Sequence, residues 1–132
     1  MSKWLNNHQS FGALVLRLAL GAAMIFHGYQ KVVPHGALDH FAHTVVTLGL
    51  PYWLGYVSAY TEFVGGILVL LGLLTRFASA LIAVNMLMAF FTVGIHHNFD
   101  FYQYQLSLAA IAIMLLFYGA GSLSIDKKIG FA

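Results

Sequence analysis

Four long apolar stretches dominate the chain, and they cover residues 11–33, 52–74, 77–95 and 103–120. A helix that crosses the hydrocarbon core of a bilayer needs about 20 such residues, so each stretch is long enough to span a membrane. A transmembrane barrel would alternate apolar and polar positions, whereas residues 66–74 are apolar without interruption. The pattern predicts an all-α integral membrane protein, a four-helix bundle that forms one domain over residues 1–132.

A shorter amphipathic segment lies between the first two stretches, at about residues 38–48. Its apolar residues recur at helical spacing, and the polar residues fill the other side. The apolar set is Leu38, Phe41, Ala42, Val45 and Val46. This periodicity predicts a helix lying in the membrane interface, ended by Gly49 and followed by Pro51.

Small residues within the stretches predict close helix packing. Gly21, Gly28, Gly55 and the pair at 65–66 are examples. In lipid, such positions allow helix backbones to approach one another. The same faces would also serve a homo-oligomer.

The composition removes several classes of protein. Only 8% of residues are charged, against about 25% in a typical soluble domain, so a free-standing water-soluble enzyme is excluded. The net charge is +2, but the basic residues are scattered, which argues against nucleic-acid binding. Without cysteine there is no disulfide, thiol catalysis or Cys-ligated cluster.

Basic residues near the ends of the stretches predict the topology. Lys3, Arg76, Lys127 and Lys128 fall on one side if both termini are cytoplasmic, as the positive-inside rule favours. Arg17 lies about two turns inside the first stretch, and we expect its long side chain to snorkel toward water.

The most informative residues are the ionisable ones inside the spans. Glu62 lies ten residues after Tyr52, at a depth of about 15 Å by helical rise, where a lone carboxylate needs a partner. His27 and Lys31 share one face of the first span, with Gln30 beside them. Two polar residues of the third span complete the predicted cluster: Asn85 and Thr92.

Such a cluster suits proton transfer to a polar headgroup such as a quinone oxygen. Glu62 or His27 would relay the proton, Lys31 would stabilise negative charge, and Asn85 would orient the ligand, with Gln30 and Thr92 as further contacts. The structural alternative is a salt bridge between Glu62 and Lys31 that fixes helix packing without chemistry.

Seven histidines raise the question of a metal or haem site. Five of them fall in or near the two loops on the side away from the termini, close to Asp39 and Asp100, whereas His8 lies on the opposite side. Their spacing matches no specific metal motif, and axial haem ligation would require histidines at matched depths. We therefore expect neither metal nor haem.

Several short motifs, taken together, resemble the DoxX family of small bacterial four-helix membrane proteins. They are RLALG at 17–21, HGYQK at 27–31, LGLP at 48–51, EFVGG at 62–66, GLLTR at 72–76 and NM at 85–86, with the tail from 119 to 126. The likeness spans nearly the whole chain. It departs from the family at residues 103–105, where relatives often carry an acidic residue and this chain has QYQ.

The resemblance implies a bacterial inner-membrane protein in a redox or quinone-linked context. Because the sequence shows no redox centre of its own, the electrons would come from a bound cofactor or a partner subunit. The expected partners are the lipid bilayer and such a redox protein. The alternative is a non-enzymatic assembly subunit or a small-solute carrier.

Overall fold

The computed structural model describes residues 1–131 and confirms the all-α fold. Within this part of the chain there is no strand, and four helices are long and apolar enough to cross a membrane. They are α2 (Gln9–Val32), α4 (Tyr52–Leu71), α5 (Thr75–Thr92) and α6 (Phe99–Tyr118). The 3₁₀ turn η1 (Gly94–His96) follows α5.

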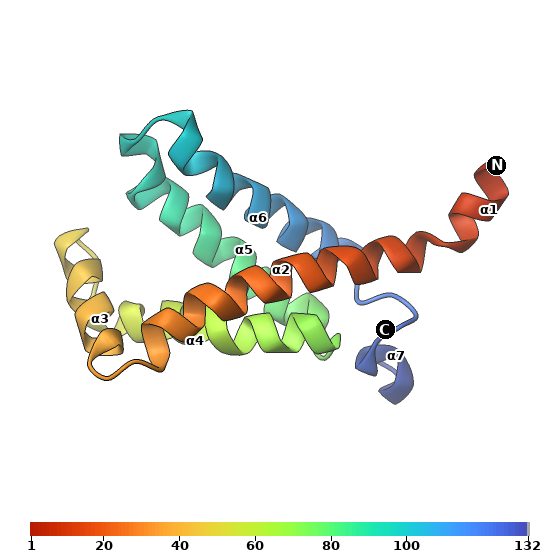
Figure 1. Cartoon of the computed structure of the whole chain (residues 1–132), viewed down its shortest axis with the longest axis horizontal. Helices are drawn as coiled ribbons and strands as arrows, with labels where there is room; N and C mark the ends of the chain where they lie inside the picture. Colours follow the sequence, from red (N-terminus) through yellow and green to blue (C-terminus); the bar gives the residue numbers. More distant parts are fainter. Residues whose placement is uncertain (132) are drawn as a thin grey trace.

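The four spanning helices form two pairs. Helix α2 packs along α4 and α5 packs along α6, and the pairs cross at an angle (Figure 1). Fully buried side chains such as Leu20, Met24, Ile82 and Leu115 fill the space between them. Large apolar residues such as Phe26, Phe91 and Phe117 are exposed on the outside, as expected of helices that face lipid.

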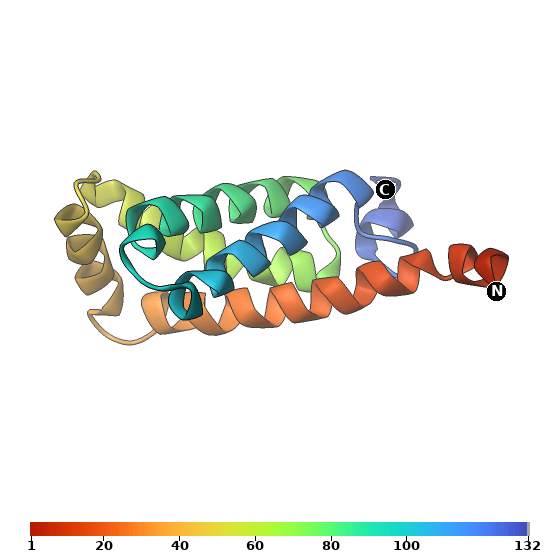
Figure 2. The same cartoon turned by 90° about the horizontal axis from the view of Figure 1, so that it is seen from above.

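The amphipathic segment is the helix α3 (Ala37–Thr47), which lies across one end of the bundle (Figures 1 and 2). Ala42 and Val45 are buried against α4, and the polar side is exposed. Gly49 follows the helix with φ of 82°, a left-handed conformation that favours glycine. The predicted helix and its end are confirmed.

Both termini lie at the opposite end of the bundle (Figure 2). Two short helices are found there, α1 (Ser2–Asn7) and α7 (Ile125–Ile129), which the hydrophobic pattern does not predict because they are only one or two turns long. Asp126 of α7 is buried and accepts hydrogen bonds from the backbone N–H groups of Leu74 and Thr75, at 2.7 and 2.9 Å. It thereby satisfies donors at the start of α5.

The expectation that Arg17 snorkels to water is wrong. Its side chain is 2% exposed, because Arg17 lies on the face of α2 that also buries Leu20 and Met24. The guanidinium donates to four backbone carbonyls at 2.7–3.0 Å: Val69, Leu70, Ala120 and Leu123. The first two belong to the last turn of α4, where carbonyls lack regular helix partners, and that of Val69 also accepts from the Gly72 N–H at 3.1 Å. Arg17 therefore ties the end of α4 to the segment after α6.

Candidate functional site

The close approach of α2 to α4 brings the polar residues of the first two spans together. At Gly28, a Cβ atom would lie 2.4 Å from the backbone nitrogen of Phe63, so no larger residue fits without moving the helices. At Gly66 of α4, a Cβ atom would lie 2.8 Å from the backbone nitrogen of Ile25. Glycines thus set the short distance between the two helices, as the sequence predicts.

Lys31 and Glu62 form an ion pair across this contact. The Lys31 ammonium donates to both carboxylate oxygens, at 2.8 and 2.7 Å. The Glu62 side chain is 4% exposed and that of Lys31 is 26% exposed. The carboxylate therefore depends on the protein for its counter-charge, whereas the ammonium also reaches the surface.

Two polar residues from α4 and α5 extend this pair into a network. Asn85 donates to a carboxylate oxygen of Glu62 at 3.1 Å, and Ser58 donates to the Asn85 side-chain oxygen at 2.6 Å. Ser58 is not among the residues predicted from the sequence. Its position four residues before Glu62 on the same helix face was the signal that could have found it.

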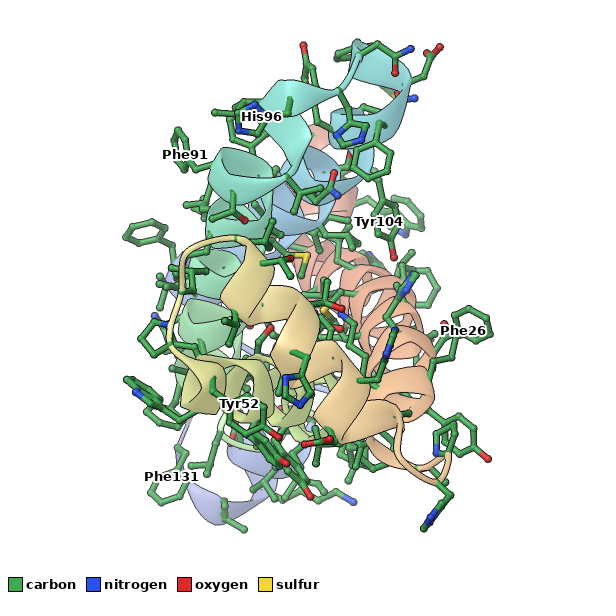
Figure 3. All side chains as sticks on the ribbon, turned by 90° about the vertical axis from the view of Figure 1, so that its left-hand side faces the viewer. Phe26, Tyr52, Phe91, His96, Tyr104 and Phe131 are labelled. Carbon is green, nitrogen blue, oxygen red and sulfur yellow. The ribbon has the colours of Figure 1, made fainter. Side chains whose placement is uncertain are left out.

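This network forms one side of a cavity of about 330 Å³, here called the α3 cavity. Its other walls are mainly apolar residues of α3, α4 and α5. Helix α3 covers it and contributes Phe41, whose ring lies 4.5 Å from the Lys31 ammonium. Figure 3 looks along the bundle at this end and shows α3 in front of the spanning helices. An apolar chamber with a few polar groups at one wall is typical of a binding site for a small apolar ligand.

Three other predicted residues lie in different places. Thr92 lines the α3 cavity, but its hydroxyl donates to the Met88 carbonyl of its own helix. His27 does not line the cavity, and its ring packs against those of Phe26 and Tyr104. Gln30 is exposed and is also absent from the cavity wall.

Helix geometry explains why Lys31 reaches Glu62 and His27 does not. Around the axis of α2, Lys31 lies about 60° and His27 about 100° from the direction of Gly28, which faces α4. The long Lys31 side chain spans that offset, whereas the short imidazole turns toward α6. Gln30 is rotated by about 160° and faces away from α4. The predicted convergence therefore holds for Lys31, Glu62 and Asn85 but not for His27.

The outer histidines make local contacts. His43 lies 3.5 Å from the Asp39 carboxylate, and Asp39 also accepts a hydrogen bond from the Tyr52 hydroxyl. His97 stacks on Phe101. Within residues 1–131, no group of three or more metal-ligating side chains is placed to hold an ion.

A polar residue of α6 also reaches the α3 cavity. Gln105, near the start of α6, lines it. With its amide oxygen and nitrogen exchanged, the nitrogen would donate to the backbone carbonyls of Phe101 and Tyr102. Gln105 thus adds a neutral group to the cavity wall.

Comparison with known proteins identifies the family. Residues 12–95 match DoxX. The chain is also similar to a protein of Bacillus subtilis (strain 168) that is named "Putative oxidoreductase CatD", with 32% identity over 95% of this chain and 92% of that protein. No solved structure matches the chain. With a family match over more than half of its length and a relative that is similar throughout, this multi-pass membrane protein belongs to the DoxX family.

Proposed function

We propose that the chain binds a quinone in the α3 cavity and serves as the membrane subunit of an oxidoreductase. The observation that carries the proposal is the Lys31–Glu62–Asn85 network at one wall of an apolar chamber. A quinone combines a flat apolar ring with carbonyl oxygens, so it matches both parts of this chamber. The resemblance and the oxidoreductase name of the Bacillus subtilis relative support a redox role.

Lys31 is suited to hold the quinone oxygen. An ammonium group has three N–H donors, and two of them are directed at the Glu62 carboxylate. The third is free to donate to a ring carbonyl. Glu62 and Asn85 keep the ammonium in position, so the donor is fixed before the ligand arrives.

Reduction of a quinone to a quinol consumes two electrons and two protons. In this proposal a reduced partner protein or its cofactor supplies the electrons. Lys31 transfers one proton to the quinone oxygen that it holds, and the resulting amine, which is partly exposed, recovers a proton from water. The other quinone oxygen takes the second proton from water. Glu62 stabilises the protonated state of Lys31 between turnovers.

The proposed location is the bacterial inner membrane, with both termini in the cytoplasm. Five of the six basic residues lie in the half of the bundle that carries the termini, and Lys31 is the exception. The positive-inside rule favours a cytoplasmic position for that end.

The first test is quinone content. The wild-type protein is purified in mild detergent, and lipids extracted from it are analysed for quinones by mass spectrometry. We expect a quinone-to-protein ratio well above that of an unrelated membrane protein, and a loss of about tenfold in Lys31→Met, since a hydrogen bond from a charged donor contributes about 1.5 kcal/mol or more. The control is Gln30→Met on the same helix, which should retain the wild-type ratio because Gln30 lies outside the cavity. A wild-type ratio at background would refute the proposal.

A non-enzymatic role is the alternative, and one observation favours it. Both oxygens of Glu62 already have donors within the protein, so the ion pair would also serve as a clamp between α2 and α4. The two roles differ in the variant Lys31→Met/Glu62→Met, where both charges are replaced by apolar groups. If the ion pair only holds α2 and α4 together, the double variant should fold and still assemble with its partner. If the pair also binds quinone, the double variant should lose the bound quinone.

A further inference from the structure

A second cavity lies at the end of the bundle that carries the termini, far from α3. It has a volume of about 220 Å³ and is here called the terminal cavity. Its wall comes from the start of α2, the start of α5, the loop after α6 and the short helix α7. Unlike the α3 cavity, it has polar or basic side chains at five of its eight lining residues: Ser10, Arg76, Tyr118, Ser122 and Lys127.

The charge around the terminal cavity is strongly positive. Arg76 and Lys127 line it, and Lys128 and Lys3 are carried by the short helices at the same end. Asp126 is the acidic residue in this part of the described chain. Its carboxylate is 4% exposed, is bonded to the start of α5 and is absent from the cavity wall. The cavity therefore favours an anion.

Arg76 is held so that one edge of its guanidinium remains available. Nη1 donates to the carbonyls of Leu116 and Phe117 at 3.1 and 2.9 Å, and Nη2 donates to that of Tyr118 at 3.4 Å. The Nε–H makes no hydrogen bond within residues 1–131. The Nε and second Nη2 donors form a fork that matches two oxygens of a phosphate.

The loop after α6 leaves room at this edge. Gly119 has φ of 91°, and a Cβ atom there would lie 3.3 Å from both Nε and Nη2 of Arg76. Glycine at this position therefore keeps a side chain away from the free edge of the guanidinium. The hydroxyls of Ser10 and Tyr118, which lie 3.5 Å apart, and that of Ser122 supply further donors around the same cavity.

Exposed aromatic residues beside the cavity indicate where the anion comes from. Phe77 follows Arg76 and is 63% exposed, and Phe117 precedes Tyr118 and is 75% exposed. Both belong to spanning helices, so they face lipid next to a polar, basic cavity at the helix ends. This is the arrangement expected where a phospholipid places its headgroup in a basic pocket and its acyl chains along the helices.

We propose that the terminal cavity binds the phosphate group of an anionic phospholipid, with Arg76 and Lys127 as its charged ligands. A lipid headgroup and a free phosphate ion would both present a phosphate to this cavity. The adjacent exposed rings of Phe77 and Phe117 favour the lipid over the free ion. This site is separate from the quinone proposal, because it lies at the other end of the bundle and shares no residue with the α3 cavity.

The proposal is tested by lipid binding to the full chain in detergent, followed by native mass spectrometry. Phosphatidylglycerol, phosphatidylcholine and inorganic phosphate are titrated separately. We expect retention of phosphatidylglycerol at concentrations where phosphatidylcholine is not retained. Displacement of the lipid by inorganic phosphate at equal concentration would overturn the lipid assignment, and equal retention of the two lipids would overturn the anion site.

Two lysines on the same short helix provide a matched pair of variants. Lys127 lines the cavity and Lys128 does not, although both are exposed and carry the same charge. Lys127→Gln should weaken phosphatidylglycerol binding by about fivefold, the effect of one basic contact near an anionic lipid, whereas Lys128→Gln should change it by less than about twofold. An equal effect of both variants would show general attraction to positive charge and would refute a specific site. Ser122→Ala provides a second test at the cavity wall, with a smaller loss expected.

Discussion

The contact between Gly28 and Phe63 provides a direct test of how α2 and α4 are held together. In Gly28→Ala, the new Cβ atom would lie 2.4 Å from the Phe63 nitrogen and 2.5 Å from its Cα. Ordinary van der Waals contact begins near 3.4 Å, and backbone atoms cannot rotate away as a side chain can. The two helices must therefore separate locally by about 1 Å.

This displacement has a cost that follows from the packing. Overpacking of a well-packed interior costs about 1–3 kcal/mol, and we expect Gly28→Ala to lower the free energy of unfolding by that amount. The same movement would lengthen the contact between Lys31 and Glu62, which is now 2.7 Å, beyond hydrogen-bond distance. Loss of stability and loss of bound quinone should therefore appear together.

Gly12→Ala on the same helix is the control. Nothing lies within 4 Å of a Cβ atom at Gly12, so this variant gains the helix propensity of alanine without a clash. Unfolding of both variants is followed by circular dichroism during titration of mixed micelles with a denaturing detergent. If Gly28→Ala is as stable as Gly12→Ala, the close approach of α2 and α4 at this point does not hold.

Three further predictions follow from other contacts. Arg17→Met should lower the free energy of unfolding by about 3 kcal/mol or more in the same assay, because buried carbonyls lose a charged donor. The stability of Arg17→Lys should fall between that of Arg17→Met and that of wild type. Wild-type stability of Arg17→Met would contradict the burial of this side chain. A double-mutant cycle of Lys31→Met and Glu62→Gln should give a coupling free energy of about 1 kcal/mol, in the lower half of the usual range of about 0.5–3 kcal/mol, because Lys31 is partly exposed. Additive effects would show that the ion pair does not form. Gly55→Val should displace α3 from α4, since a Cβ atom at Gly55 would lie 2.5 Å from the Ala42 Cα. The displacement should appear as faster chemical labelling of a cysteine introduced at Ala42. An unchanged labelling rate would refute the packing of α3 against α4 at this point.

Some of the site follows from the sequence alone. The hydrocarbon core of a membrane penalises a lone carboxylate wherever the surrounding helices lie, so the position of Glu62 in the second span already requires a cation or hydrogen-bond donor nearby. Lys31 and Asn85 are the polar residues of neighbouring spans at a comparable depth, and both contact Glu62 in the structure. Ser58 was missed because a serine carries no comparable burial penalty, so its place one helical turn before Glu62 was the only signal for it.

The sequence by itself determined the long elements, but not the short helices α1 and α7. The four spans and the amphipathic helix depend only on length and local hydrophobic pattern. Each spanning helix satisfies its own backbone hydrogen bonds, so it is stable in the membrane without help from distant segments. Their bounds differ from the predicted ones by only a few residues; α6, for instance, begins at Phe99 rather than near residue 103.

The tertiary structure alone decided how those helices are rotated and what lies between them. A spanning helix such as α2 is apolar on most of its surface, so its hydrophobic pattern does not show which face meets a neighbour. The glycine contacts set that rotation, and they direct Lys31 toward Glu62, His27 toward α6 and Arg17 into the interior. Both cavities also arise from packing between segments distant in sequence, which is why the α3 cavity and the terminal cavity became visible only in the folded molecule.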